Sequence, residues 1–172
     1  MSNADIVKAK YFAEIAHAGQ VYNDEVPYTV HLEQVVQTLD KFGIRSNDMI
    51  CGAWLHDVIE DTGKSYSDIK SRFGEDVAEI VCAVTSELGR NRKERNIKTY
   101  PKIKASERAL ILKLADRIAN VNYGLISGGK TDMYAKEFED FRNSLKSEAT
   151  DSNPVILNMW KYLAKLLNKE AL

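Results

Sequence analysis

The stretch from Cys51 to Thr62 constrains this chain most, because an apolar helical pattern runs directly into four ionisable side chains. His56 precedes Glu60 by four residues. Asp57 precedes Asp61 by the same interval, so each pair falls on one face of a helix. Apolar residues lie between them, and burying such groups is costly unless a partner compensates their charge. We expect a metal or catalytic site here; an acidic cluster at a solvated helix end is the alternative.

Two more polar residues stand in apolar helical patterns elsewhere in the chain. His31 lies in the first turn of a helix predicted to begin near Tyr28, where a lone histidine is usually structural. Asp116 lies within the apolar run from Ala109 to Ile118, and a buried carboxylate needs a partner. Arg117 is the ordinary candidate for that partner, and a metal ion is the other.

The residues His31, His56–Asp57 and Asp116 come from three separate predicted helices. Two imidazoles and two carboxylates form a mixed nitrogen and oxygen donor set that suits Mn²⁺, Fe²⁺, Mg²⁺ or Zn²⁺. Such an ion makes bound water easier to deprotonate and polarises a phosphoryl oxygen. The combination therefore points to metal-assisted hydrolysis of a phosphate ester.

Glu60 and Asp61 follow the histidine–aspartate pair by one helical turn. From that position we expect Glu60 to position or deprotonate the attacking water. Asp61 is expected to orient the same water or to bind another one next to the metal ligands.

The segment from Glu87 to Lys104 has a local excess of positive charge in a chain that is otherwise nearly neutral. Its acidic residues are Glu87 and Glu94, and its basic residues are Arg90, Arg92, Lys93, Arg95, Lys98, Lys102 and Lys104. A charge run of this kind is usually a solvated helix surface. The functional alternative is a phosphate-binding flank.

Composition and length limit the remaining choices. The chain has 172 residues, 44% of them apolar and 28% charged, which suits one soluble domain over residues 1–172. A formal net charge of -1 provides no general attraction for nucleic acid or anionic membranes. No membrane span or signal-peptide pattern is found, so we expect a cytoplasmic protein. Cys51 and Cys82 are expected to be buried thiols, and the number of subunits is left open.

Helical periodicity accounts for most of the chain, and we find no alternating strand pattern. The expected helices are Ala4 to Ala18, Tyr28 to Phe42, a central helix to about Glu60, a short one ending at Phe73, Asp76 to Thr85, Ser106 to about Leu125, Thr131 to Lys146, and Pro154 to Asn168. We expect Ile15 to face inward from the first helix. The segment from Gln20 to Pro27 is expected to be a polar loop, with Pro27 suited to start the next helix.

Six short blocks, in order and spacing, resemble the hydrolase domain of the RelA/SpoT alarmone enzymes, which are HD-domain metal-dependent phosphohydrolases. The blocks are Gly19-Gln20, Pro27-Tyr28-x-x-His31, Leu55 to Thr62, Phe73-Gly74-x-x-Val77, Val84-Thr85, and Lys113-Leu114-Ala115-Asp116-Arg117-x-x-Asn120. The resemblance covers about residues 17–120. It is closest to the free-standing small alarmone hydrolases of the metazoan SpoT-homologue type.

The resemblance implies an all-helical bundle of about eight to ten helices that removes the 3′-pyrophosphate from ppGpp or pppGpp and releases diphosphate. It implies that His31, His56, Asp57 and Asp116 hold Mn²⁺, with Fe²⁺, Zn²⁺ or Mg²⁺ as alternatives. It also implies that Glu60 and Asp61 are catalytic. The residues implied to bind the substrate are Tyr22, Asn23, Tyr28, Asn120, Arg92, Lys93 and Arg95. Among these, Asn120 matches an asparagine that contacts the ribose.

The chain departs from the family pattern where the base is recognised. Tyr22-Asn23 stand where relatives usually have Arg-Lys, so a cationic contribution to base binding is missing. A tyrosine can still stack on a purine, and an asparagine can still hydrogen-bond its edge. Adenine alarmones such as pppApp, or phosphatase action on NADPH or another nucleotide phosphomonoester, are therefore alternative activities. A non-catalytic nucleotide-binding module is a further alternative, which the Glu60-Asp61 pair disfavours.

Overall fold

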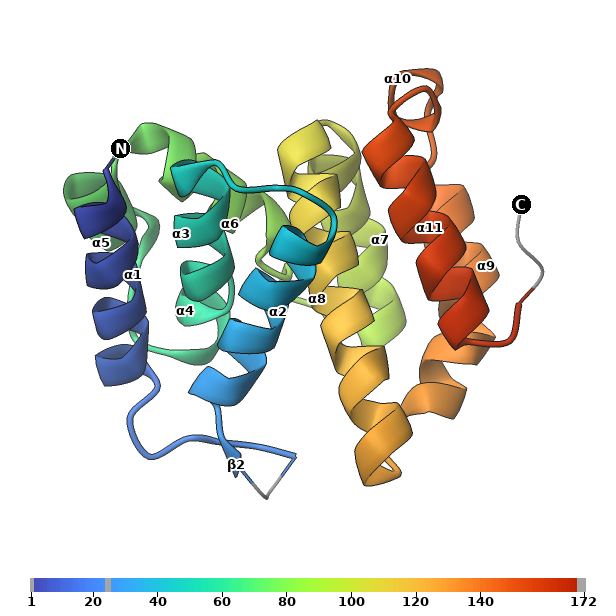
Figure 1. Cartoon of the computed structure of the whole chain (residues 1–172), viewed down its shortest axis with the longest axis horizontal. Helices are drawn as coiled ribbons and strands as arrows, with labels where there is room; N and C mark the ends of the chain where they lie inside the picture. Colours follow the sequence, from blue (N-terminus) through green and yellow to red (C-terminus); the bar gives the residue numbers. More distant parts are fainter. Residues whose placement is uncertain (1, 24–25, 170–172) are drawn as a thin grey trace.

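Helices form most of the computed structural model, which describes residues 2–23 and 26–169 (Figure 1). The helices are α1 (Asn3–Ala16), α2 (Thr29–Lys41), α3 (Asn47–Leu55), α4 (Val58–Asp61), α5 (Tyr66–Phe73), α6 (Glu75–Val84), α7 (Arg92–Lys104), α8 (Glu107–Ser127), α9 (Thr131–Leu145), α10 (Glu148–Asp151) and α11 (Pro154–Leu166). Two of these, α4 and α10, have four residues each, which leaves nine longer helices in the described part of the chain. The predicted all-helical bundle is confirmed.

The helix α8 is the axis of the bundle, as its central place in Figure 1 shows. It has 21 residues and contacts α2, α3, α6, α7, α9 and α11. A helix surrounded in this way must be apolar on most of its faces, and the run from Ala109 to Ala115 supplies that surface. The hydroxyl of Ser106 accepts a hydrogen bond from the Ala109 amide at the N-terminus (3.2 Å). At the other end Gly128 takes the left-handed conformation (φ 74°) that stops the helix.

The remaining helices pack in two groups on either side of the α2–α8 pair (Figure 1). On one side α1 packs on α3, α3 packs on α6, and α5 packs on α6. On the other side α9 packs on α7, and both α9 and α11 pack on α8. Aromatic rings join the last two long helices, since Phe141 and Trp160 have ring centroids 5.2 Å apart. Helical periodicity places Phe138, Phe141 and Trp160 on the inward faces of these helices, and all three are buried.

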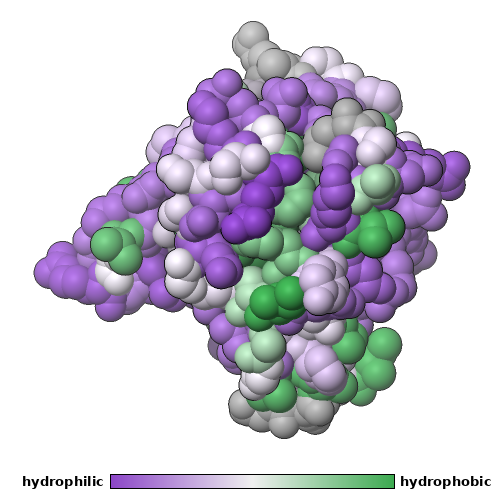
Figure 2. All heavy atoms as spheres, turned by 90° about the vertical axis from the view of Figure 1, so that its left-hand side faces the viewer, coloured by the Kyte–Doolittle hydropathy of each residue, from purple (hydrophilic) through white to green (hydrophobic). Residues whose placement is uncertain are grey.

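The first helix differs from the prediction on one face. Ile15 was expected to point inward, but 56% of it is exposed. It lies on the same side of α1 as Val7 and Tyr11, which are also exposed, because these residues are four apart. Figure 2 views the molecule from the α1 side and shows hydrophobic atoms interrupting a mostly hydrophilic surface. The inward face of α1 is instead formed by small residues, Ala9 and Ala13, which allow close packing on α3.

A two-stranded antiparallel hairpin occupies the segment that was predicted to be a loop. Its strands are β1 (Val21–Tyr22) and β2 (Val26–Pro27), in the register Val21↔Pro27 and Tyr22↔Val26. Pro27 therefore belongs to β2, and α2 begins two residues later at Thr29, so the prediction that Pro27 starts the helix was wrong. The hairpin directs the ring of Tyr22 into the interior, where only 9% of the residue is exposed.

Among the described residues, no helix is both long enough and apolar enough to cross a membrane. The two cysteines are free thiols; Cys51 is buried as predicted, whereas Cys82 is only partly buried.

Truncating the core of α8 should be costly. Leu110 is fully buried, so Leu110→Ala is expected to lower the free energy of unfolding by about 2–5 kcal/mol. Leu88→Ala is the control, because Leu88 is 89% exposed and its loss should cost less than about 0.5 kcal/mol. Urea unfolding followed by circular dichroism measures both values. Equal losses in the two variants would contradict this assignment of the core.

Candidate metal centre

The central helix breaks at the residues that were predicted to bind metal. A continuous helix to about Glu60 was expected, but α3 ends at Leu55 and α4 begins at Val58. His56 and Asp57 form the junction and keep near-helical backbone angles. The backbone resumes its helical hydrogen bonding at once, because the Asp61 amide donates to the Asp57 carbonyl (2.9 Å). The break lets the neighbouring His56 and Asp57 side chains reach one centre.

The four predicted ligands lie together where α2, α8 and the α3–α4 junction meet. The Nε2 atoms of His31 and His56 are 3.3 Å apart. Asp116 Oδ1 lies 3.4 Å from His31 Nε2 and 3.8 Å from His56 Nε2. Asp57 Oδ2 lies 3.0 Å from His56 Nε2 and 3.6 Å from His31 Nε2. Ligand atoms of His31, His56 and Asp116 all fall within 4.8 Å of one another, which is the spacing of groups around a single ion.

The chemistry of this donor set fits a divalent cation. The Nδ1 atom of His56 lies 2.8 Å from the Ala53 carbonyl, so Nδ1 carries the proton in the neutral ring and Nε2 keeps its lone pair. That lone pair faces the ring of His31 and two carboxylate oxygens. Buried acceptors crowded in this way need a cation or protons between them. The residues therefore fit a metal of the kind that nitrogen and oxygen ligands bind.

The same crowding shifts the pKa values of the cluster. Burial alone would lower the pKa of His31, but its hydrogen bonds and ion pairs with Asp116 and Asp57 raise that pKa to about 9. Burial also opposes the charged form of His56, and Asp57 outweighs it, so the pKa of His56 is raised. Burial would raise the pKa of Asp116, but Lys113 and the two histidines hold it far below its usual range. Without a cation, the His31 imidazole therefore keeps its proton at neutral pH.

Tyr28 connects the candidate ligand Asp57 to the candidate catalytic residue Asp61. Its hydroxyl lies 2.7 Å from Asp57 Oδ2 and 2.8 Å from Asp61 Oδ2. One hydroxyl proton can serve only one of these contacts, so the other requires a proton on a carboxyl group. Burial and the Asp57 charge raise the pKa of Asp61, which favours the proton on that residue. Tyr28 thus serves as a link between two carboxyl groups.

A brace from the end of α1 holds Tyr28 and Asp61 in place. His17, the C-terminal cap of α1, stacks on the ring of Tyr28 with centroids 4.6 Å apart. Its Nδ1 atom lies 2.7 Å from Gln20 Oε1, and Gln20 Nε2 donates to the Asp61 carbonyl (2.8 Å). His17 is buried and has a packing role at the end of α1. Glu60 is held separately, since its Oε2 accepts a hydrogen bond from the Ser86 amide (2.9 Å).

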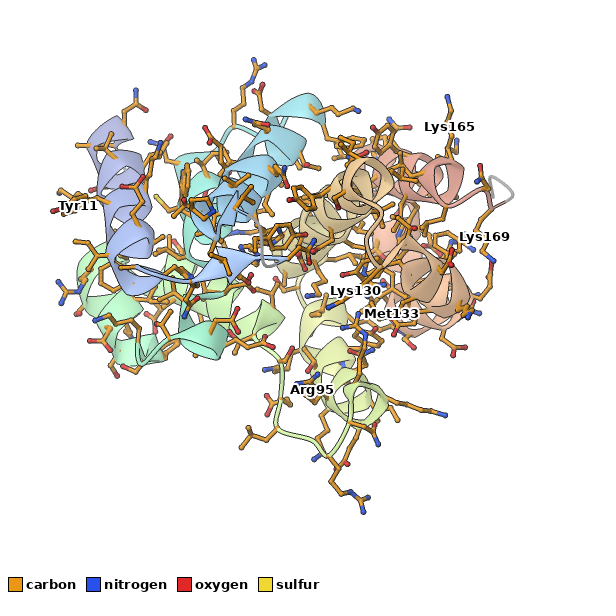
Figure 3. All side chains as sticks on the ribbon, turned by 90° about the horizontal axis from the view of Figure 1, so that it is seen from below. Tyr11, Arg95, Lys130, Met133, Lys165 and Lys169 are labelled. Atoms are coloured by element: carbon orange, nitrogen blue, oxygen red, sulfur yellow. The ribbon has the colours of Figure 1, made fainter. Side chains whose placement is uncertain are left out.

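A cavity of about 170 Å³ covers the centre and is lined mainly by polar side chains. The predicted residues that line it are Tyr22, Tyr28, His31, Asp57, Glu60, Asp61, Arg92, Asp116 and Asn120. The other two basic residues predicted to bind substrate are not brought into it. Lys93 lines a different cavity, and Arg95 is exposed on α7, as Figure 3 shows from below. Asn23 is exposed and has a left-handed backbone (φ 51°) after β1.

Tyr22 and Asn120 are engaged with each other. The Tyr22 hydroxyl donates to Asn120 Oδ1 (2.6 Å), and Asn120 Nδ2 donates to Asp116 Oδ1 (2.5 Å). The ring of Tyr22 stacks on His31 with centroids 4.8 Å apart. The tyrosine therefore supports two candidate metal ligands, and its ring packs on the His31 imidazole where the sequence suggested a platform for a purine.

Four residues that were not predicted to belong to the site also line the cavity: Ser86, Lys113, Arg117 and Tyr134. Arg117 and a metal ion were the two partners considered for Asp116, but the side chain that contacts Asp116 Oδ2 is Lys113, through Nζ at 2.8 Å. Helix geometry explains this, because residues three apart share a face whereas adjacent residues do not. Arg117 pairs instead with Glu137 (3.4 Å). Lys113 could have been predicted from its spacing, because it precedes Asp116 by three residues on α8. Tyr134 comes from α9, and nothing in the sequence indicated that it lies near the site.

Comparison with known proteins agrees with this geometry. Residues 9–141 match the HD domain family. The guanosine-3′,5′-bis(diphosphate) 3′-pyrophosphohydrolase of Aquifex aeolicus is 36% identical over 122 residues, which are 68% of this chain and 17% of that protein. A probable chloroplastic GTP diphosphokinase of Arabidopsis thaliana is 32% identical over 93% of this chain and 23% of its own length. The chain thus spans about a fifth of these longer relatives.

A shorter relative matches over a larger share of its length. The guanosine-3′,5′-bis(diphosphate) 3′-pyrophosphohydrolase MESH1 of Drosophila melanogaster is 32% identical over 123 residues, which are 69% of each chain. Among solved structures, a metazoan orthologue of SpoT that hydrolyses ppGpp has a TM-score of 0.78, with 24% identity and 96% of both chains covered. A Listeria monocytogenes protein has a TM-score of 0.63 at 22% identity, with 81% of this chain covered. These two structural likenesses establish the shared fold.

Metal binding should release protons and strengthen with pH. A cation must displace the proton that the raised pKa of His31 retains, so affinity for Mn²⁺ should rise about tenfold per pH unit between pH 6.5 and 8.5. Titration calorimetry in two buffers of different ionisation enthalpy counts the protons released. An affinity that did not change with pH, with no proton release, would contradict this protonation state.

Proposed function

Since the chain belongs to the HD-domain family, we propose that it is a metal-dependent hydrolase that removes the 3′-pyrophosphate of ppGpp or pppGpp and releases diphosphate. The observation that carries the proposal is one cavity that combines three of the four candidate ligands with Glu60, Asp61 and three basic side chains. A site with that content suits an anionic phosphate ester and an attacking water. The match to MESH1 over 69% of both chains supports the same reaction.

His31, His56, Asp57 and Asp116 would hold the cation, for which we propose Mn²⁺, with Fe²⁺, Zn²⁺ or Mg²⁺ as alternatives of the same coordination chemistry. When bound, the cation would supply Lewis-acid polarisation of a phosphoryl oxygen and a lowered pKa for water. The packing around these ligands keeps them oriented. Tyr22 stacks on His31, Tyr28 holds Asp57, and Lys113 holds Asp116.

Glu60 and Asp61 divide the proton transfers between them in this proposal. Glu60 is exposed to the cavity and is positioned by the Ser86 amide, so its carboxylate takes the proton from the attacking water. Asp61 has a raised pKa and contacts the Tyr28 hydroxyl, so it supplies a proton to the departing 3′ oxygen. Lys113, Arg92 and Arg117 balance the negative charge of the phosphates.

The base-binding part of the proposal has a specific second candidate. The hairpin carries Tyr22-Asn23, and Tyr22 is turned inward onto Asn120 and His31. A cavity of about 170 Å³ with polar lining would hold the phosphates. Neither Tyr22 nor Asn23 offers a cationic contact to a guanine base, which leaves hydrolysis of adenine alarmones or of the 2′-phosphate of NADPH as the second candidate. The position of Glu60 and Asp61 in the cavity supports catalysis over simple nucleotide binding.

Removing the general base should separate catalysis from metal binding. Glu60→Gln is expected to lower kcat for ppGpp by at least about 100-fold while Mn²⁺ affinity stays within about twofold. Asp57→Ala should lose both turnover and metal. Glu33→Gln, an exposed position on α2, is the matched control and should keep full activity. Diphosphate release by anion exchange and metal content by elemental analysis give the two readouts; full activity in Glu60→Gln would refute the mechanism.

Product analysis should identify the substrate class. We expect the Mn²⁺-loaded protein to release diphosphate from ppGpp when ppGpp, pppApp and NADPH are offered separately. Orthophosphate from NADPH alone would establish the phosphomonoesterase alternative, and diphosphate from pppApp alone would establish an adenine preference. Failure on all three would reject this set of nucleotides as substrates while leaving the metal centre in place.

A further inference from the structure

One ion pair joins two residues that line different cavities. Arg92 of α7 lines the 170 Å³ cavity at the metal centre, and Glu137 of α9 lines a larger cavity of about 840 Å³ between α7 and α9. The pair is bidentate: Arg92 Nε lies 2.7 Å from Oε1 of Glu137, and Arg92 Nη2 lies 3.1 Å from Oε2. Arg92, which lines the candidate phosphate site, is therefore held by Glu137, which does not line that site.

Glu137 has a second arginine partner that is fixed much more firmly. Arg117 Nη1 lies 3.4 Å from Glu137 Oε2, and the Arg117 side chain is only 4% exposed. Its guanidinium lies over the rings of Phe141 and Tyr134, at 4.2 and 4.6 Å from their centroids. Arg92 is different, because 40% of its side chain is exposed and it lies 5.8 Å from the Tyr134 centroid. Arg117 is anchored by rings, whereas Arg92 is free to move once its carboxylate contact is exchanged.

We propose that Glu137 competes with a phosphate group of the substrate for Arg92. Arg92 pairs with Glu137 in the free protein and exchanges that carboxylate for the phosphate when substrate binds. The strength of the Arg92–Glu137 pair then sets substrate affinity. The proposal rests on the proposed function, because it takes the substrate to carry a phosphate or diphosphate group. Guanidinium binds carboxylate and phosphate with the same two-pronged geometry, so the two anions compete for Arg92.

Arg117 lowers the free-energy cost of this exchange. If Glu137 had one partner, moving Arg92 would leave a partly buried carboxylate without a counter-charge, which is costly. Arg117 stays beside Glu137 and neutralises it when Arg92 leaves. Glu137 is thus a positioning residue: it acts through Arg92 and lines the outer cavity rather than the metal-site cavity.

Kinetics test the exchange directly. Glu137→Gln weakens the competing contact, so KM for ppGpp should fall about three- to fivefold with kcat unchanged. Glu137→Asp keeps the charge with a shorter reach and should fall between wild type and Glu137→Gln. Glu139→Gln, exposed on the same helix, is the matched control and should leave KM unchanged. Thermal unfolding of each variant checks that it is folded.

The decisive comparison is the effect of Glu137→Gln in the wild-type protein and in the Arg92→Ala variant. Arg92→Ala should raise KM, and adding Glu137→Gln to Arg92→Ala should then change KM no further, because the competed group is gone. A rise in KM for Glu137→Gln alone would overturn the proposal. The proposal would also be overturned if Glu137→Gln lowered KM by the same factor in the wild-type protein and in the Arg92→Ala variant.

A binding measurement separates this proposal from the proposed reaction. Sulfate is titrated into Mg²⁺-loaded protein, and the side-chain Nε–H signal of Arg92 is followed by NMR. The signal should shift on binding, and Glu137→Gln should saturate at about three- to fivefold lower sulfate concentration. If no variant hydrolyses ppGpp and this pattern holds, the reaction is wrong and the exchange stands. If ppGpp is hydrolysed but neither KM nor sulfate affinity responds to Glu137→Gln, the exchange is wrong.

Discussion

Two imidazoles and two carboxylates share one small buried volume, and the rest of the structure depends on keeping them there. His31, His56, Asp57 and Asp116 come from α2, the α3–α4 junction and α8, so no local segment can hold them together. Apolar packing along α8 provides the free energy that brings these elements into contact, and the crowded acceptors make the site receptive to a cation or to protons. The free energy gained by packing α8 therefore offsets the unfavourable crowding of acceptors at the site.

The second layer of contacts differs on the two sides of the centre. On the hairpin side, stacked rings and neutral hydrogen bonds dominate, with His17 on Tyr28 and Tyr22 on His31. These contacts orient the acidic groups without adding net charge. On the α9 side, the contacts are ionic, with Glu137 pairing with Arg92 and Arg117. An anionic substrate would meet the metal ligands on the first side and the guanidinium groups of Arg92 and Arg117 on the second.

The sequence predicted the architecture well where the signal was local. The helical periodicity of the long apolar runs indicated an all-α bundle, and the core faces of α9 and α11 follow from it. It failed where a single residue changes the backbone path. Neither the break between Leu55 and Val58 nor the hairpin that takes up Pro27 has a periodic signature, and Ile15 faces solvent because small alanines on α1 make the closer contact with α3.

For the site, the sequence by itself determined which residue types are available and, through the resemblance, which four are the candidate metal ligands. Tertiary structure decided how they are supported. It placed Arg92 in the cavity while Lys93 and Arg95 point elsewhere, turned Tyr22 onto His31, and brought Tyr134 and Glu137 from α9 to the arginines. The physical reason is range. Spacing along one helix fixes which side chains share a face, whereas contacts between helices depend on how the whole apolar core packs.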